Sequence, residues 1–424
     1  MKELKVALVH DWILGLGGAE RTLKVLHEMF PEAPIYTFFY NKKFTSQFLP
    51  KANIKASFIQ NLYKLKILNH KLFLPLLPMA AESFDLSNFD LVISSSVAFS
   101  KGLILKPKTK HICYCHSPTR FLWDWHREYL KRFDLGLLKK SNLGLSGWGI
   151  RIIQHFLRIW DRQAANRVDQ FVANSKTVQQ RIKKYYGRDS IVIYPPIETL
   201  GQHTSSDLRK SQRDFLIAQS GSSCQEPRPL DQKLQRAGSL TNRATRHFER
   251  PQRHDGQSFQ DYYLIVSRLF SHKNIDIAIK AFNKLELPLI IIGSGPEYGR
   301  LKKMVENKSM IKLLGEIPDE KLEEYYTNAK AFIMPQEEDF GMTPIEAMSC
   351  GKPVLALRRG GALEYVLEGI NGEFFDDPHP AVLADGVRRL NENYKNYSPL
   401  VIKKTAERFS RSRFEEEICH LVFL

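Results

Sequence analysis

Residues 335–372 read PQEEDFGMTPIEAMSCGKPVLALRRGGALEYVLEGING and decide the fold. A short apolar segment, AKAFIMP, runs into this stretch, and a second one, KPVLAL, lies inside it. The residues from Pro344 onward, between the two segments, have the pattern of a helix. A strand, a helix and a second strand in this order are the repeating unit of a parallel sheet covered by helices. The sequence therefore predicts an α/β fold.

Two glutamates stand at the turn of this unit. Glu338 follows the first strand, and Glu346 falls just inside the helix. Open α/β sheets bind ligands in the crevice at the carboxyl ends of their strands. Two acceptor carboxylates beside a helix N-terminus suit a ligand that has many hydroxyls and carries phosphate. The pair therefore indicates a site for a sugar nucleotide.

The same stretch resembles the signature of the family 4 retaining glycosyltransferases of the GT-B fold. That signature joins a Glu-x7-Glu pair to a Gly-x-Pro-Val strand and a Gly-Gly-x-x-Glu turn, which here are Glu338 to Glu346, residues 351–354 and residues 360–364. The resemblance implies two Rossmann-like domains whose parallel sheets face each other across a cleft. It also implies transfer of a hexose with retention, with Glu338 against the transferred sugar and Glu346 on the ribose hydroxyls.

Apolar strands alternate with amphipathic helices in two separate parts of the chain, which predicts four regions. Residues 1–199 form an N-terminal Rossmann-like acceptor domain, and residues 259–405 form a C-terminal Rossmann-like domain that binds the nucleotide sugar. Residues 200–258 are rich in Gln, Ser and Arg and are expected to be a disordered insertion, either a tolerated surface segment or one that binds a partner. Residues 406–424 read as a helix, which the resemblance places back on the N-terminal domain.

The chain of 424 residues carries a net charge of +16 that is unevenly distributed. Residues 1–200 hold 30 Lys and Arg against 15 Asp and Glu, whereas residues 259–424 hold 22 against 25. An excess of this kind attracts anionic lipid, nucleic acid or a polyanionic substrate, or it serves solubility alone. No nucleic-acid recognition module accompanies it, so a nucleic-acid partner is not expected.

Cysteine usage favours a reducing compartment. The five cysteines form no CxxC pair and no plausible disulfide framework, and they are Cys113, Cys115, Cys224, Cys350 and Cys419. The start of the chain, MKELKVALVHD, reads as a buried strand rather than as a signal peptide. No apolar run approaches the ~20 residues that a spanning helix needs. A cytoplasmic protein, peripheral on the inner face of the cell membrane, is expected.

Two cations follow the first strand of the C-terminal domain. Arg268 stands at the strand end, and Lys273 precedes a helix for which Asn274 is the expected N-cap. Cations at such a turn suit a diphosphate, because they neutralise the charge that grows on a leaving group. Ordinary solvated basic residues are the alternative. The resemblance assigns an Arg and a Lys at matching positions to catalysis and donor binding.

The helix start beside the glutamates offers backbone donors. The N–H groups of Phe340, Gly341, Met342 and Thr343 are expected to point toward sugar hydroxyls or phosphate. Thr343, Pro344 and Glu346 also fit a capping box, so Glu346 could simply cap its own helix. The flanking Glu337 and Asp339 read as rim charges.

Further candidates come from both domains. Gly17 and Gly18 follow the first strand without the GxGxxG spacing, which argues against a nicotinamide enzyme and matches the family's glycine-rich turn. His116 lies in YCHSPTR, where the family places a catalytic histidine near the transferred sugar; a structural histidine is the alternative. Arg120 is a weaker candidate for phosphate or acceptor binding, and Gly293 matches the family's Gly-x-Gly-Pro turn on the nucleotide side.

No spacing of metal ligands appears, so neither a metal nor another cofactor is expected. Two segments, 59–79 and 130–160, mix Leu, Ile, Phe and Trp with Lys and Arg. They read either as surfaces that bind anionic lipid or as buried helices with basic outer faces.

Together these features predict a hexosyltransferase, and the family resemblance implies that it retains the configuration at the anomeric carbon. The sequences around HSPTR and RRGGALE look most like bacterial mannosyltransferases of surface-polysaccharide (O-antigen) assembly, which makes GDP-mannose the first donor to consider and a lipid-linked saccharide the acceptor. A sugar-nucleotide epimerase on the same scaffold and a non-catalytic partner subunit of GT-B fold are the alternatives.

Overall fold

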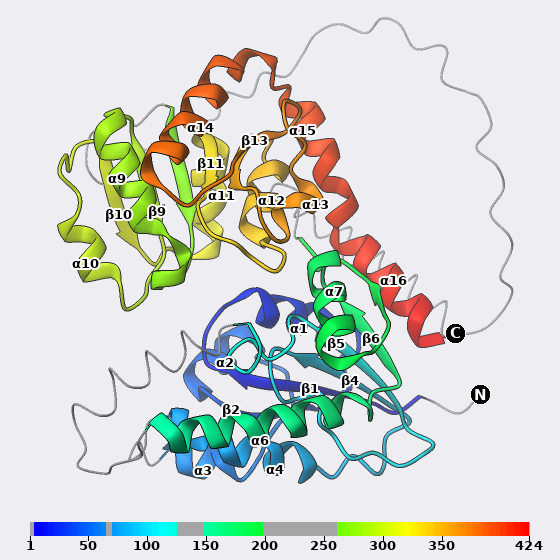
Figure 1. Ribbon diagram of the computed structural model, residues 1–424. Coiled ribbons are helices and arrows are strands. Elements are labelled where there is room, and N and C mark those ends of the chain that lie inside the picture. Colours follow the sequence, from blue (N-terminus) through cyan, green and yellow to red (C-terminus); the bar gives the residue numbers. More distant parts are fainter. Residues whose placement is uncertain (1–3, 65–69, 125–146, 198–260, 424) are drawn as a thin grey trace, which may run out of the picture. The chain divides into compact units, whose positions relative to one another are not determined.

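A computed structural model describes residues 4–64, 70–124, 147–197 and 261–423 (Figure 1). Residues 1–199 and 261–424 belong to one compact unit. The predicted insertion, 200–258, lies outside the described residues. Among the residues described, no helix is both long and apolar enough to cross a bilayer.

The first sheet has seven strands in the order β3-β2-β1-β4-β5-β6-β7, and every pair is parallel. The strands are β1 (Val6–Ile13), β2 (Ile35–Tyr40), β3 (Ile54–Ala56), β4 (Leu91–Ser96), β5 (Lys110–Cys115), β6 (Gln170–Ala173) and β7 (Ser190–Val192).

The second sheet has six strands in the order β10-β9-β8-β11-β12-β13, again all parallel. The strands are β8 (Tyr262–Val266), β9 (Leu289–Ile292), β10 (Ile311–Gly315), β11 (Ala329–Met334), β12 (Val354–Leu357) and β13 (Gly372–Phe375). The predicted α/β class with parallel sheets is confirmed.

Helices connect successive strands of both sheets, except for β4 and β5, which residues 97–109 join without a helix. In the first part of the chain they are α1 (Gly18–Met29), α2 (Lys42–Phe48), α3 (Ile59–Lys64), η1 (His70–Leu76), α4 (Leu77–Glu82), α6 (Gly147–Ala165) and α7 (Lys176–Tyr186). In the second part they are η2 (Ser271–Lys273), α9 (Ile275–Leu285), α10 (Tyr298–Lys303), α11 (Asp319–Asn328), α12 (Met342–Ser349), α13 (Ala362–Tyr365), α14 (Pro380–Glu392), η3 (Tyr394–Asn396), α15 (Pro399–Ala406), η4 (Glu407–Phe409) and α16 (Arg411–Phe423).

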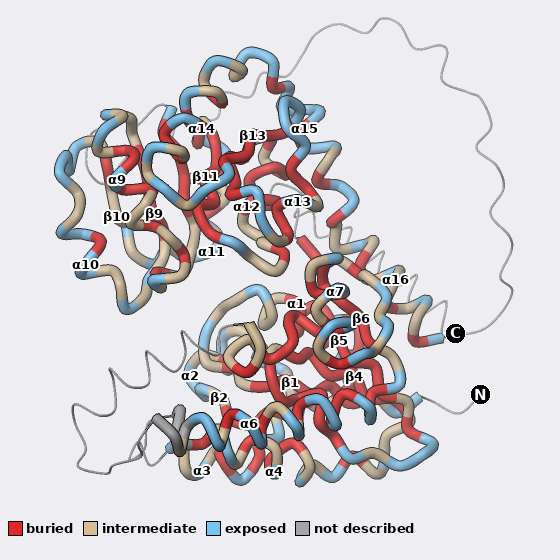
Figure 2. Tube along the Cα trace, in the orientation of Figure 1, coloured by how far each residue is buried: buried red, intermediate tan, exposed pale blue. Residues whose placement is uncertain are grey.

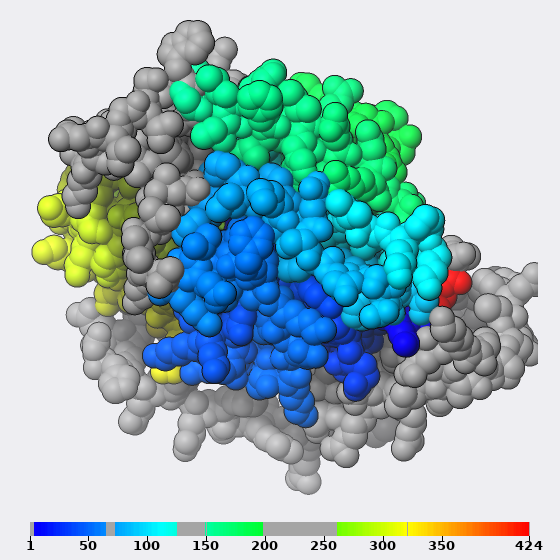
Figure 3. Space-filling model, turned by 90° about the horizontal axis from the view of Figure 1, so that it is seen from below, coloured from blue at the N-terminus to red at the C-terminus, as the bar shows by residue number. Residues whose placement is uncertain are grey.

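Both faces of the first sheet are covered, and β1, β4 and β5 are coloured mostly as buried in Figure 2. Leu8 and Tyr114 pack on one face against α1 and against the apolar side of α16, which contributes Phe414 and Ile418. Helices α4 and α6 cover the opposite side and lie beside each other in Figure 1 and at the surface in Figure 3. Burial on both faces explains why the strands read as continuous apolar runs rather than as alternating ones.

The direction of winding reverses once in each sheet, between β1 and β4 and between β8 and β11. Chain segments that leave the two strands at such a point diverge to opposite faces and open a crevice at the carboxyl ends. These two edges are therefore the places where the fold positions a ligand site.

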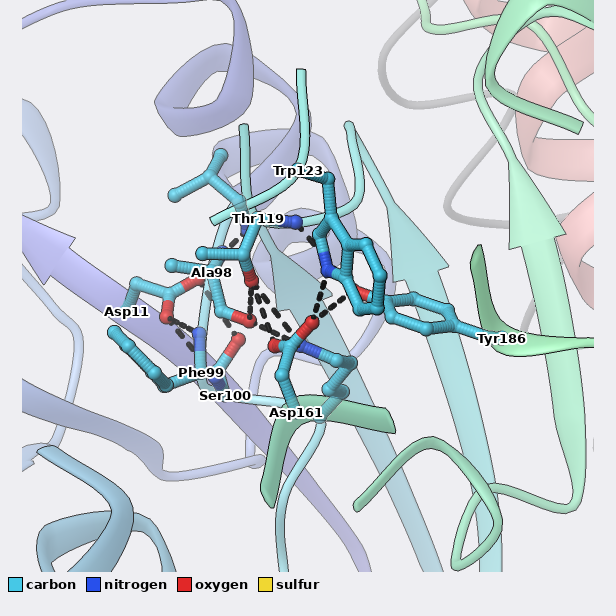
Figure 4. Close-up of polar contacts among 10 residues, drawn as sticks. Asp11, Ala98, Phe99, Ser100, Thr119, Trp123, Asp161 and Tyr186 are labelled. Atoms are coloured by element: carbon cyan, nitrogen blue, oxygen red, sulfur yellow. Dashed lines mark hydrogen bonds and ion pairs between the residues drawn. The ribbon is translucent and has the colours of Figure 1, made fainter. Parts of the chain in front are cut away.

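A buried carboxylate shapes the first of these edges (Figure 4). Asp11 is fully buried, and its two oxygens accept hydrogen bonds from the backbone N–H groups of residues 97–100, at 2.6–3.0 Å. Four charge-assisted bonds fix the turn that follows β4. The same turn carries Lys101, whose Nζ lies 2.5 Å from the buried carboxylate of Asp161 on α6.

Candidate functional site

Lys273 and Glu338 form an ion pair at the carboxyl edge of the second sheet. Lys273 ends η2, which follows β8, and Glu338 lies in the loop that follows β11. Because β8 and β11 are neighbours at the point where the winding reverses, their following loops meet. The structure thus brings the two predicted residues together.

The ion pair fixes the charge of Glu338. Burial by itself would raise the pKa of Glu338, but the charge and hydrogen bond of Lys273, the charge of Arg120 and a 3.0 Å hydrogen bond from Gln336 together lower it to about 2. Glu338 is therefore a carboxylate at neutral pH. It can accept hydrogen bonds from sugar hydroxyls and stabilise positive charge, but it holds no proton to donate.

The Gly-Gly turn after β12 holds the backbone that carries Glu338. The N–H of Gly361 donates to the carbonyl of Glu338 at 2.9 Å. A Cβ at Gly361 would lie 2.5 Å from the Cα of Phe340, so a side chain there would push this loop away. The glycines of residues 360–364 thus act on the site through backbone packing.

Helix α12 begins two residues earlier than expected. Its N-cap is Gly341, with φ +92°, and no side chain caps it. The predicted capping box is therefore wrong: Thr343 lies within the first turn, and Glu346 does not cap the helix. Because Met342 and Thr343 open the helix, their N–H groups have no intrahelical acceptor and face the region beyond its N-terminus.

Glu346 is bound by two other side chains instead. One carboxylate oxygen accepts a 2.7 Å hydrogen bond from the hydroxyl of Tyr326, and the other lies 3.2 Å from the guanidinium of Arg21 on α1. Arg21 also pairs with Asp319 at 3.0 Å. The glutamate is 5% exposed and lines a cavity of about 40 Å³ together with Arg21 and Met342.

The phosphate-side candidates lie on the loops after β8 and β9. Arg268 is exposed, and its guanidinium lies over the ring of Phe270, 5.8 Å from the ring centroid. Gly293 has φ +133°, and a Cβ there would lie 2.0 Å from the carbonyl oxygen of Ser267. Only glycine lets the two loops approach this closely.

The glycine-rich turn after β1 contacts α12. Gly17 is the N-cap of α1, and Gly18 is its first residue. A Cβ at Gly18 would lie 3.0 Å from the sulfur of Met342, so this position has no room for a larger residue without a shift of Met342. The glycine-rich turn that was predicted to bind the donor therefore lies next to the first residue of α12.

His116 follows β5 and belongs to a hydrogen-bonded chain of buried groups. Its Nε2 lies 2.9 Å from Oγ of Ser95, and Oγ lies 3.1 Å from Nδ1 of His10. Burial, with a smaller effect from the charge of His10, lowers the pKa of His116 to about 3. The imidazole is therefore neutral at physiological pH, which suits hydrogen bonding to a sugar better than charge stabilisation.

Asp339 was expected at the rim of the site, but it lies inside and binds Arg120. It is not a rim charge, because its side chain is 15% exposed and forms ion pairs with Arg120 and Arg181. Arg120, predicted to contact phosphate or acceptor, is thus held by a carboxylate next to Glu338. Glu337 is 45% exposed and pairs with Arg181 at 3.2 Å, in keeping with its expected place at the rim.

The donor contact expected of Phe340 is through its backbone N–H, and its side chain has a separate structural role. Its ring is buried in an aromatic cluster with Tyr194, Tyr365 and Phe409, at centroid distances of 5.5–5.9 Å. Its side chain stabilises the loop, so any contact with a donor would come from its backbone. No local sequence pattern indicates this cluster, because its members are far apart in the chain.

Among the described residues, no group of three or more His, Cys, Asp or Glu side chains is arranged to hold a metal ion. The charged groups around Glu338 pair with one another.

Two family models match the chain. The model described as Glycosyltransferase Family 4 matches residues 16–199, and the model described as Glycosyl transferases group 1 matches residues 249–410. An uncharacterized glycosyltransferase of Methanocaldococcus jannaschii is 31% identical over 136 residues, which are 31% of this chain and 39% of that protein. A GDP-mannose-dependent phosphatidylinositol monomannoside mannosyltransferase of Mycolicibacterium smegmatis is 33% identical over 127 residues, 26% of this chain and 33% of that protein.

A solved structure shares the fold over the whole chain. HepE of Anabaena, in complex with UDP-glucose, superposes with a TM-score of 0.62 at 18% identity and covers 99% of both chains. The chain spans well under half the length of the two curated relatives. The first family model covers β2 to β7 of the first sheet, and the second covers all strands of the second sheet and begins inside the predicted insertion. The chain is a member of the family 4 glycosyltransferases with the GT-B fold.

Proposed function

We propose that this protein transfers a hexose from a nucleoside diphosphate sugar to a hydroxyl of an acceptor, with retention at the anomeric carbon and without a metal. One observation carries the proposal: Lys273 and Glu338 meet at the reversal of the second sheet, beside the uncapped start of α12. A cation for the diphosphate, a carboxylate for the sugar and N–H groups without an intrahelical acceptor are thereby gathered at one edge.

In the proposed reaction the bond between the anomeric carbon and the phosphate oxygen breaks while the acceptor oxygen attacks from the same face. The acceptor proton passes to the departing phosphate oxygen, so no enzyme nucleophile is needed. Lys273 and Arg268 would neutralise the charge that develops on the leaving diphosphate. Glu338, ionised because its pKa is about 2, would hold the sugar hydroxyls and stabilise the cationic ring.

The ribose would bind at Glu346. Arg21 now occupies one oxygen of that carboxylate, so a bound ribose would replace or share this contact. His116, neutral and held by Ser95, would donate to or accept from a hydroxyl of the transferred sugar.

The donor is proposed to be GDP-mannose, because the motif contexts resemble mannosyltransferases and one relative is named for GDP-mannose. HepE binds UDP-glucose on the same fold, so GDP and UDP donors must be compared directly. The acceptor is proposed to be a lipid-linked saccharide of surface-polysaccharide assembly, reached from the cytoplasmic face of an anionic membrane through the basic residues of 1–199.

Thermal shift with GDP-, UDP- and ADP-sugars tests the donor. A ligand at 100 times its Kd stabilises a folded protein by about 2.7 kcal/mol. We expect a shift with GDP-mannose that Arg268→Ala and Glu338→Ala abolish, whereas Arg388→Ala, which changes an exposed arginine on α14, retains it. If none of the donors raises the melting temperature of the unmodified protein, the proposal is wrong.

A further inference from the structure

Helix α6 presents large apolar side chains to solvent. Ile152, Phe156 and Ile159 are 51%, 64% and 44% exposed. Their spacing of four and then three residues places them along one stripe of the helix. An outward helix face in a globular protein is normally polar. A row of three large exposed apolar residues on α6 therefore needs an explanation beyond folding.

The opposite face of α6 already stabilises the fold. Leu157 and Ala164 are buried, and Asp161 is fully buried in the ion pair with Lys101. The carboxylate of Asp161 also accepts hydrogen bonds from Thr119, Trp123 and Tyr186, at 2.8–2.9 Å (Figure 4). The helix is thus fixed in orientation, and its apolar stripe does not arise from a loosely packed element.

The exposed charges that α6 itself places around the stripe are of one sign. Arg151 and Arg162 are exposed beside it, and Arg158 is half-buried. The only acidic residue of α6 is Asp161, which is buried and neutralised by Lys101. The outward face of α6 therefore carries guanidinium groups and no carboxylate.

An apolar stripe flanked by arginines matches the interface of an anionic bilayer. Apolar side chains enter the boundary between headgroups and acyl chains, while guanidinium groups bind the lipid phosphates. The residues that include α6 form a strip of the surface in Figure 3, next to segments of α3 and α4. The exposed fractions of Ile152, Phe156 and Ile159 make the stripe accessible to a partner.

We propose that the outward face of α6 docks on an anionic phospholipid surface through Ile152, Phe156 and Ile159, with Arg151 and Arg162 on lipid phosphates. This deepens the proposed function, on which it rests for a lipid-linked acceptor, because it names the surface that meets the membrane. The docking itself requires no donor or acceptor and can be measured separately.

Vesicle sedimentation with the full chain tests the docking. We compare vesicles of phosphatidylcholine with vesicles that contain 30% phosphatidylglycerol, at low and high salt. The unmodified protein should bind only the anionic vesicles, and high salt should weaken binding. The variant Ile152→Ser/Phe156→Ser, which removes the apolar contacts, should bind the anionic vesicles at least about tenfold more weakly. The variant Arg151→Gln/Arg162→Gln, which removes the charges, should bind them more weakly by roughly tenfold or more.

Leu400→Ser is the matched control, because Leu400 is 79% exposed on α15 and should not affect binding. Far-UV circular dichroism of each variant verifies the fold. Hydrogen exchange of the unmodified protein, with and without anionic vesicles, gives a measurement that needs no variant, and protection should include α6.

Several results would overturn the proposal. These are equal binding to neutral vesicles, unchanged binding of the α6 variants, or vesicle protection that leaves out α6. A dimer in light scattering that the Phe156 variant dissociates would instead assign the stripe to a second copy of the chain. The α6 variants should keep the thermal shift with nucleotide sugars, so failure of the donor proposal and failure of docking remain distinguishable.

Discussion

Lys273 and Glu338 form an ion pair although 65 residues separate them in the sequence. The pair exists because each residue follows one of two adjacent strands, β8 and β11. Their side chains are 10% and 21% exposed, so the interaction is only weakly screened by solvent. The same ion pair therefore contributes to the stability of the C-terminal part of the chain and to the chemistry proposed for it.

Replacement of Lys273 by Ala should therefore affect both properties. Glu338 would stay largely buried without its main partner, which costs about 3 kcal/mol of unfolding free energy. Loss of a cation at the diphosphate should lower kcat by at least a hundredfold. Urea unfolding and initial rates with the donor identified by thermal shift measure the two effects.

The matched control is Arg358→Ala. Arg358 pairs with Glu368 in the same part of the chain, but both side chains are about 40% exposed. Exposed pairs contribute about 0–1 kcal/mol, so stability and rate should hardly change. Equal losses in the two variants would contradict a special role for Lys273.

Gly361→Ala tests how the Gly-Gly turn positions Glu338. The new Cβ would collide with the backbone at Phe340, which must shift together with Glu338. We expect at least a tenfold rise in the Kd for donor and a loss of about 1–3 kcal/mol in stability. Isothermal titration and urea unfolding provide the values.

Gly299→Ala is the control for the glycine substitution, since Gly299 lies in α10 and an added Cβ would meet no atom within 4 Å. This change should leave donor affinity unchanged and hold or slightly raise stability. Donor affinity that is unchanged in Gly361→Ala would show that the turn does not position the site.

The buried Lys101–Asp161 pair predicts strong coupling. Each single change, Lys101→Met or Asp161→Leu, leaves a partner uncompensated in the interior and should cost about 3–5 kcal/mol. The double variant should lose clearly less than the two single losses combined. Urea unfolding of all four proteins gives the coupling energy, and additive losses would mean that the two groups act independently.

Much of this arrangement could be foreseen. The strand-helix-strand pattern around Glu338 predicted parallel sheets, and the strand-end positions of Arg268 and Lys273 predicted the edge at which they lie. The capping box predicted at Thr343 is wrong. The φ of +92° at Gly341 lets α12 start at Met342, two residues before Pro344. Tertiary packing thus overrides the local preference of the sequence Thr343-Pro344-Ile345-Glu346 for a helix start.

Contacts between distant segments could not be foreseen. Asp339 pairs with Arg181, 158 positions away, and Arg21 reaches Glu346 across 325 positions. The residues that flank each of these side chains form no recognisable motif for an ion pair, so the local sequence does not predict the partner. The strands β3 and β13 have only three and four residues, too few to show a periodic pattern in the sequence, and they gain their strand geometry by pairing with β2 and β12.

Acid should destabilise the protein through its buried histidines. Burial lowers the pKa of His116 to about 3 and, against a smaller opposing effect of Asp169, that of His111 to about 4. The unfolded chain, with a histidine pKa near 6.5, binds the proton first, so stability is full above pH 6.5 and falls as the pH drops toward 4. Between pH 7.5 and 5.5 each histidine should cost about 1 kcal/mol of unfolding free energy.

Comparison of His116→Gln and His111→Gln with the unmodified protein isolates these contributions, because glutamine can keep one hydrogen bond and does not titrate. Each variant should lose about 1 kcal/mol less than the parent between the two pH values, by urea unfolding. Only His116→Gln should also reduce kcat, because His111 pairs with Ser94 inside the sheet and lies outside the proposed site. An imidazolium role for His116 would instead require a rate that rises between pH 7.5 and 5.5 and a pKa above the one that burial imposes.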